Sequence, residues 1–298
     1  MCLDVSSALK VDKVDNKTIS GDSGNKVVRA VRITKKYIPI LYVIFLMLPL
    51  YSIVCYSFKT EFEIKNSITL IPMLGTMANY KAIFSDPQSY MAFINSVLYV
   101  VVNNVISLVV AVPAAYAFSR YSFLGDKHLF FWFLASRMTP PATVAIPLFQ
   151  LYSTLGIVDT HFAVALAHCL FTVPVAVWIL EGFISAVPRE LDEIAQLDGY
   201  SFPQYFMKIL IPAIAPGIGV TSFFCFIFSW VEILLANWLT TVNAVPFGSI
   251  ILRAGTALGL NSLGSLSAMA VLAILPGVLF IYFVRDNLAK GFALGQIR

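Results

Sequence analysis

Charged side chains are scarce in this 298-residue chain, and that scarcity sets its class. Asp, Glu, Lys and Arg together make up 12% of the residues, whereas a soluble domain carries about 25%. Hydrophobic residues account for 59%, and the mean hydropathy is +0.83. This balance excludes an ordinary soluble domain and indicates an integral membrane protein.

Patterns that would build a catalytic, nucleotide or metal site are also missing. The chain has no Gly-x4-Gly-Lys-Ser/Thr run, so we expect no P-loop and no cofactor on this chain. Its only histidines are His128, His161 and His168, and no cysteine or carboxylate cluster completes a metal site with them. We interpret them as hydrogen-bonded residues of a pore or interface, with a metal or proton role as the weaker alternative. Hydrolase patterns are absent too, so we expect neither an enzyme nor a nucleic-acid partner.

Cysteine is rare, and its placement excludes a disulfide framework. Of the four cysteines, Cys55, Cys169 and Cys225 fall within long apolar runs, where they are expected to act as small packing residues. The first 36 residues lack the apolar core of a secretory signal, so we expect no cleavable signal peptide.

Long apolar runs dominate the remainder of the chain. They predict an all-α integral membrane fold with six spanning helices, each near the roughly 20 residues that cross a bilayer core. The predicted spans are 37–58, 92–118, 129–153, 161–181, 214–236 and 265–284. The predicted organisation is a mostly disordered tail (1–36), a transmembrane domain (37–284) and a C-terminal tail (285–298). A short helix is expected near 79–84, and 239–264 favours a re-entrant or interfacial segment.

The distribution of lysine and arginine predicts the orientation. The tail before the first span carries eight of them, and fifteen of the twenty lie on that side of the predicted topology. Four lie on the other side, and Arg137 falls within a predicted span. Cytoplasmic loops carry such an excess, so both termini are predicted to be cytoplasmic.

One acidic insert, residues 188–212, interrupts the apolar pattern. It carries Glu190, Asp192, Glu193 and Asp198 on a side that should be basic. The pattern predicts a short helix with acidic residues in its first turn, a stop at the next glycine, and a second short helix. An amphipathic helix lying on anionic lipid would favour basic residues, so we expect a protein partner for this insert.

The insert resembles the "EAA" loop of permeases from ATP-binding-cassette importers, whose pattern is Glu-Ala-Ala-x-x-x-Gly, nine residues, then Ile-x-Leu-Pro. The matching positions here are Glu193, Ala195, Gly199, Ile209 and Pro212, and Asp198 fits the Asp-Gly that is frequent in this loop. Two departures, Ile194 for Ala and Ile211 for Leu, are both apolar. Pro-Ala-Ala-Tyr-Ala-Phe-Ser-Arg at 113–120, Phe-Ser-Trp-Val-Glu at 228–232 and Ala-Lys-Gly-Phe-Ala-Leu-Gly at 289–295 extend the resemblance from about residue 37 onward. The whole set is similar to the second (MalG-like) permease of carbohydrate importers.

This resemblance implies a type I importer permease in the bacterial inner membrane, and it implies the partners. They are a sister permease, a cytoplasmic ATPase dimer seated on the loop at 188–212, an extracytoplasmic solute-binding protein and membrane lipid. ATP would be bound by the ATPase subunit, and the tail at 287–298 would also reach toward it. Ser-Arg-Met-Thr-Pro-Pro-Ala at 136–142 is similar to permeases for glycerol or other small polyols, while a disaccharide stays open.

Two charges at membrane depth mark a candidate solute pathway. Intramembrane charges usually face a cavity or a partner charge, and an aromatic face beside hydrogen-bonding groups suits a polyhydroxylated solute. The candidate pathway residues are Arg137, Trp230, Glu232 and Asn237. The alternatives for the two charges are a structural ion pair, or a position of Arg137 nearer the membrane interface. A stand-alone secondary transporter or channel is the rival for the whole chain, but no inverted repeat supports it.

Overall fold

A computed structural model describes residues 22–66, 71–73, 75–257 and 263–295, and all regular structure within these ranges is helical. The chain divides into two compact units, residues 1–52 and 53–298, and each is described by itself. The first unit holds most of α1 (Asp22–Ser57). The segment Tyr37–Ser57 of α1 coincides with the first predicted span and is long and apolar enough to cross a membrane. The helix at residues 22–36 differs from the disorder predicted for the tail, and residues 1–21 lie outside the described ranges.

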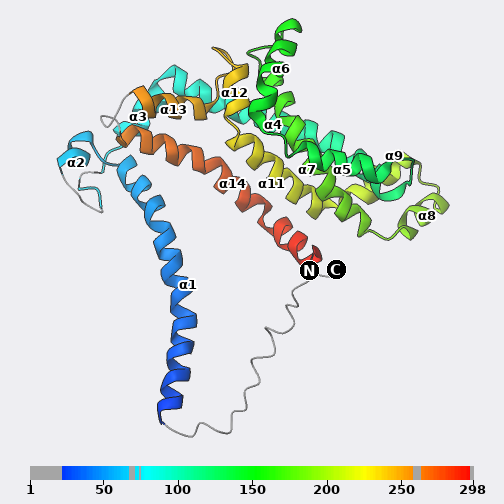
Figure 1. Ribbon diagram of the computed structural model, residues 1–298, viewed down its shortest axis with the longest axis horizontal. Helices are drawn as coiled ribbons and strands as arrows, with labels where there is room; N and C mark the ends of the chain where they lie inside the picture. Colours follow the sequence, from blue (N-terminus) through cyan, green and yellow to red (C-terminus); the bar gives the residue numbers. More distant parts are fainter. Residues whose placement is uncertain (1–21, 67–70, 74, 258–262, 296–298) are drawn as a thin grey trace. The chain divides into compact units, whose positions relative to one another are not determined.

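Four helices form the centre of the second unit: α4 (Pro87–Arg120), α7 (His161–Ser185), α11 (Ala215–Val231) and α14 (Leu263–Gly295). α7 packs against both α4 and α11, and α14 packs against α11 (Figure 1). Side-chain caps define two of the starts. Asp86 accepts hydrogen bonds from the first amides of α4, and Thr160 accepts one from the amide of Ala163 in α7.

Polar side chains join these helices inside an otherwise apolar core. The Asn103 amide of α4 donates to the Ala165 carbonyl and the Thr172 hydroxyl of α7, both at 3.1 Å. Asn104 donates to the Ser222 carbonyl of α11, also at 3.1 Å. Interhelical hydrogen bonds of this kind substitute for the hydrophobic drive that lipid cannot provide.

The third predicted span is wrong as a single helix. Residues 129–153 form two helices, α5 (Asp126–Ser136) and α6 (Pro141–Thr154), with a break between them. Pro140 has an extended backbone (ψ 134°), because the ring of the following Pro141 disfavours helical geometry in the residue before it. Within the described residues, four helices are long and apolar enough to cross a membrane, or five if one bent pair counts as a span.

The bent pair contains the fifth predicted span. Its parts, residues 202–213 and 215–231, meet at 76°. Of the predicted span at 214–236, only α11 forms one continuous helix. That helix ends at Val231, and a separate short helix, α12 (Leu234–Leu239), follows Glu232. The acidic insert comprises α8 (Glu190–Leu197), α9 (Phe202–Tyr205), the π-helix η2 (Phe206–Leu210) and α10 (Ile211–Ala213).

Shorter helices occupy the connections. α2 (Glu61–Asn66) and α3 (Ala78–Ser85) follow α1, and the latter confirms the helix predicted near 79–84. α13 (Phe247–Ala257) lies within the stretch predicted to be re-entrant or interfacial and packs against α4 and α14.

Asp159 closes the turn between α6 and α7 onto a distant loop. Its carboxylate accepts hydrogen bonds from the backbone amides of Thr241, Val242, Asn243 and Ala244, at 2.9–3.3 Å. The residue has a left-handed backbone (φ 63°), a geometry that short polar side chains tolerate best. Burial raises the pKa of Asp159, but the four amides lower it more, so its pKa lies below the ordinary value.

Replacing Asp159 with Asn should destabilise this connection, because one neutral oxygen cannot satisfy four amides. We expect a loss on the order of 1 kcal/mol, measured as a lower unfolding midpoint in detergent. Since its pKa is depressed in the folded state, Asp159 stabilises fully above the unfolded pKa of about 3.9. The stabilisation is lost as pH falls further, through the folded pKa. The difference from wild type should therefore be constant between about pH 5 and 8. An equal effect of Glu61→Gln, an exposed acid, would contradict this role.

Candidate functional site

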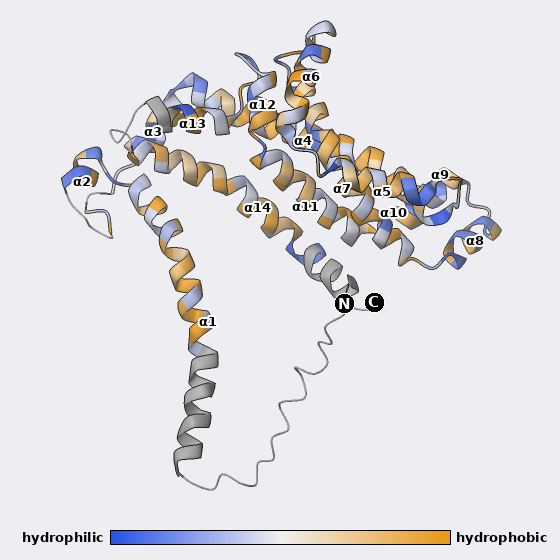
Figure 2. Ribbon diagram, in the orientation of Figure 1, coloured by the Kyte–Doolittle hydropathy of each residue, from blue (hydrophilic) through white to orange (hydrophobic). Residues whose placement is uncertain are grey.

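The acidic insert folds into a capped helical hairpin, as the sequence predicts. α8 begins with three acidic residues in its first turn, which complement the positive end of the helix. Gly199 ends it with a left-handed backbone (φ 81°). The amide of Gly199 donates to the Gln196 carbonyl and that of Tyr200 to the Ala195 carbonyl, both at 3.0 Å, which is the Schellman arrangement. Figure 2 shows hydrophilic residues on α8, in contrast to the mainly hydrophobic α7.

The second arm of the hairpin starts from a capping box. The backbone amide of Ser201 donates to the Gln204 side chain at 3.0 Å, as the spacing predicts. The helix then widens into η2 before Pro212. Ile209 is half-buried against the core, whereas Pro212 is exposed.

Large apolar side chains of the hairpin face outward. Ala195 is 2% exposed and packs into the core, but Leu197 is 87% exposed, Ile194 54% and Phe202 55%. Glu193 and Asp198 are exposed beside them. Exposed apolar residues rimmed by charges mark an interaction surface. That these residues contact an ATPase stays a prediction.

The sequence did not reveal how the hairpin is attached to the helices. Arg120, the last residue of α4, forms a largely buried ion pair with Asp192 of α8, with Nε 2.8 Å from Oδ2. Both residues are visible in the sequence, but they lie 72 positions apart and no spacing rule joins them.

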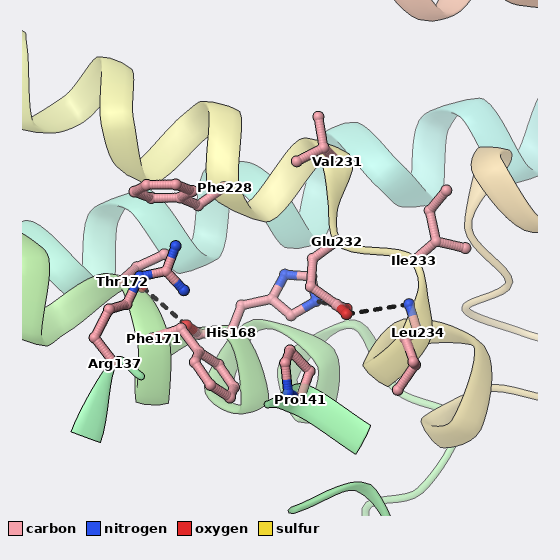
Figure 3. Close-up of a pocket in the computed structure, with 10 residues that line it drawn as sticks. All are labelled: Arg137, Pro141, His168, Phe171, Thr172, Phe228, Val231, Glu232, Ile233 and Leu234. Atoms are coloured by element: carbon pink, nitrogen blue, oxygen red, sulfur yellow. Dashed lines mark hydrogen bonds and ion pairs between the residues drawn. The ribbon is translucent and has the colours of Figure 1, made fainter. Parts of the chain in front are cut away.

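A cavity of about 430 Å³ lies at the breaks between α5 and α6 and between α11 and α12. Figure 3 shows Arg137, His168 and Glu232 among the residues that line it, with Phe171 and Phe228 as aromatic walls. The structure thus brings together two of the four predicted pathway residues, Arg137 and Glu232, from segments far apart in sequence.

Arg137 stacks on an aromatic wall of this cavity. Its guanidinium carbon lies 4.1 Å from the centroid of the Phe228 ring and 5.9 Å from that of Phe171. Within the described part of the chain, no carboxylate lies within ion-pair distance of Arg137. Stacking satisfies the face of the guanidinium and leaves its in-plane N–H donors for a ligand.

Glu232 is held at the opposite wall. Its carboxylate accepts hydrogen bonds from the amides of Leu234 and Leu235, so it caps α12, and its Oε2 lies 3.3 Å from Nε2 of His168. His168 is buried, and its Nδ1 lies 2.7 Å from the Ser229 hydroxyl. The prediction that His168 is a hydrogen-bonded residue is therefore confirmed. Among the residues that the structure describes, no cluster of three His, Cys, Asp or Glu side chains could hold a metal ion.

The other two predicted pathway residues lie outside the cavity lining. Trp230 stacks on Phe226, with ring centroids 5.8 Å apart, and its indole N–H donates to the Ala273 carbonyl of α14 at 3.0 Å. Asn237 accepts a hydrogen bond from the Ser249 hydroxyl at 3.0 Å. Both contacts are structural, and a pathway role for either residue stays a prediction.

Comparison with known families identifies the chain. Residues 89–293, which include the hairpin and the cavity, match the family of binding-protein-dependent transport system inner membrane components. The chain belongs to this family.

Relatives of known description agree with this membership. The chain is 30% identical over 254 residues to the trehalose transport system permease protein SugB of Mycobacterium tuberculosis, covering 85% of this chain and 92% of that protein. It is 26% identical to the sulfoquinovosyl glycerol transport system permease protein SmoH of Agrobacterium fabrum, covering 81% and 85%. This permease is thus a multi-pass inner-membrane protein and not an enzyme.

A solved structure supports the fold. A chain of a bacterial ABC transporter involved in the import of the acidic polysaccharide alginate superposes with a TM-score of 0.75 at 19% identity. The match covers 87% of this permease and 96% of that chain. The all-helical fold expected from the sequence is therefore shared with a known importer chain, while the six spans and the orientation of the termini stay predictions.

The cap of α12 by Glu232 can be tested directly in this permease. Replacing Glu232 with Ala removes the acceptor for two amides, which costs about 1 kcal/mol and corresponds to about fivefold faster hydrogen exchange at those amides. Glu232→Gln keeps an acceptor oxygen and should exchange more slowly than Glu232→Ala. Equal exchange at Leu234 and Leu235 in wild type and both variants would exclude the cap.

Proposed function

We propose that this chain is the permease subunit of an ATP-binding-cassette importer that carries a small polyhydroxylated solute, such as glycerol, another polyol or a sugar. It would pair with a sister permease and receive solute from an extracytoplasmic binding protein. ATP would be hydrolysed by a separate cytoplasmic dimer that contacts the hairpin at 188–212. Both termini would lie in the cytoplasm.

The exposed apolar surface of the hairpin carries this proposal. Ala195 of the hairpin faces the core, but Leu197 is 87% exposed. Exposed apolar side chains of this kind are typical of a surface that a second protein covers. The acidic side chains beside it would disfavour anionic lipid as the covering partner. The match of Glu193, Ala195 and Gly199 to the importer loop supports an ATPase as that protein.

A binding-protein partner is supported by the family description and by a second solved structure. That structure is a bacterial alginate ABC transporter in complex with an alginate pentasaccharide-bound periplasmic protein, with a TM-score of 0.64 at 15% identity. The match covers 87% of this chain and 94% of that one.

The cavity supports a polyhydroxylated solute. Arg137 supplies donors at one wall, Glu232 supplies an acceptor at another, and two phenylalanine rings supply apolar faces. Sites for small molecules combine apolar walls with a few placed polar groups in this way. The names of the relatives, which include trehalose and sulfoquinovosyl glycerol permeases, support a carbohydrate or polyol class.

The mechanism we propose is alternating access. Closure of the ATPase dimer on ATP moves the hairpin, and the hairpin moves the helices around the cavity, so that it opens outward to receive solute. The nucleotide and solute sites are then coupled through one two-state element that both bias.

The docking role of the hairpin predicts a specific loss of partner binding. Replacing Leu197 with Asp should weaken the ATPase contact by about 2 kcal/mol, or about thirtyfold, because a leucine is no longer buried there. Glu193→Lys should uncouple ATP hydrolysis from uptake while the chain stays inserted. Leu155→Asp is the control, since Leu155 is 61% exposed but lies in the turn before α7. Wild-type co-purification and uptake in both hairpin variants would rule out this coupling surface.

The pathway role of the cavity predicts a loss of uptake without a loss of assembly. Glu232→Gln and Arg137→Gln each remove one polar contact to the solute, worth about 1 kcal/mol or a roughly fivefold rise in KM for uptake. The measurement is uptake of radiolabelled polyols and sugars into proteoliposomes that hold the full importer. Arg285→Gln removes an exposed charge elsewhere and should leave uptake unchanged. Unchanged uptake in both cavity variants would contradict the pathway.

A further inference from the structure

One acidic residue of α8 turns inward, in contrast to its exposed neighbours. Asp192 forms an ion pair with Arg120 at the end of α4, with Nε 2.8 Å from Oδ2. Its other oxygen accepts a hydrogen bond from the Tyr205 hydroxyl of α9, and the Tyr116 hydroxyl of α4 lies 3.5 Å from Oδ2. We call these four residues the Asp192 clamp. It joins both arms of the hairpin to one membrane helix.

A second layer of contacts reinforces the clamp. Arg120 also donates to the Val187 carbonyl at 3.0 Å, just before α8. In the opposite direction, Arg189 donates to the Ser119 carbonyl at 3.0 Å. The Ser119 and Ser185 hydroxyls lie 2.8 Å apart, which links α4 to the end of α7. The end of α4 and the start of the hairpin therefore hold each other by reciprocal arginine contacts.

Burial makes the charge pair a specific connection. The Arg120 side chain is 6% exposed and that of Asp192 is 15% exposed, so water screens their attraction poorly. Burial and the neighbouring Asp192 carboxylate raise the pKa of Tyr205, so its hydroxyl stays a neutral donor. Loss of one partner would leave the other charge buried without compensation.

The helix that the clamp holds also forms part of the structure around the cavity. The Tyr99 ring of α4 packs edge-on against His168 with centroids 5.6 Å apart, and His168 contacts Glu232. Between these points Asn103 fastens α4 to α7. α4 therefore runs from the hairpin, which the clamp holds, to the residues that surround the cavity.

We propose that Asp192 is a positioning residue that locks the hairpin to α4, so that hairpin motion driven by the ATPase is transmitted to the cavity. This rests on the proposed function, because it assumes that the hairpin contacts an ATPase. Asp192 belongs to no position of the importer-loop pattern that the sequence matched. Its role is to couple motion, and the exposed side chains of the hairpin are the ones that bind.

The test is Asp192→Asn in the complete importer, reconstituted in proteoliposomes with its binding protein. The substitution keeps the shape but removes the negative charge that pairs with Arg120. We expect the ATPase to co-purify and basal hydrolysis to stay within twofold of wild type. Uptake per ATP hydrolysed should fall at least tenfold. Glu61→Gln removes an exposed carboxylate from α2, outside the hairpin, and should leave this ratio unchanged.

A double-mutant cycle separates positioning from a general loss of fold. Arg120→Gln alone should lower uptake per ATP as Asp192→Asn does. The double variant should be no worse than either single variant, because each loses the same connection. Independent, multiplying losses, or a wild-type ratio in Asp192→Asn, would overturn the clamp. Failure of the ATPase to co-purify with the wild-type chain would instead overturn the proposed function. It would overturn the clamp's coupling role as well, because no ATPase would then move the hairpin.

Discussion

Every polar group that this chain takes below the membrane surface must find a partner within the protein, because lipid offers none. Polar side chains supply such partners among the packed helices, and others fasten the connections outside them. Asn103 and Asn104 fasten α4 to its neighbours in the core, Asp159 satisfies the amides of a distant loop, and Asp192 holds the arginine that ends α4. These contacts fix how the helices sit, while apolar packing fills the space between them.

The same constraint explains the two broken helices. A continuous helix satisfies its own backbone, so a break at membrane depth exposes amides and carbonyls that need other partners. At the end of α11 the Glu232 carboxylate accepts hydrogen bonds from the first amides of α12. At the end of α5 the chain turns at Pro140, which has no amide to satisfy. Both breaks border the cavity, so the irregular backbone and the polar side chains occupy one place.

The sequence predicted the regular parts of this fold well and the irregular parts poorly. Apolar runs located α1, α4, α7 and α14, and the proline, glycine and acidic residues of the insert located its hairpin. The double proline at 140–141 was visible, but hydropathy alone joined α5 and α6 into one span. Trp230 was chosen for its type, yet its stacking on Phe226 depends on the neighbouring helix and cannot be read from spacing. The ion pair between Arg120 and Asp192 was hidden for the same reason.

The contact of Asp159 with residues 241–244 also has a consequence for how the protein is made. Its two sides are separated in sequence by α7 and α11, so the contact can form only after both helices have been synthesised. This turn therefore closes late in the folding of the chain, and its closure marks the point at which the two ends of that long segment have come together.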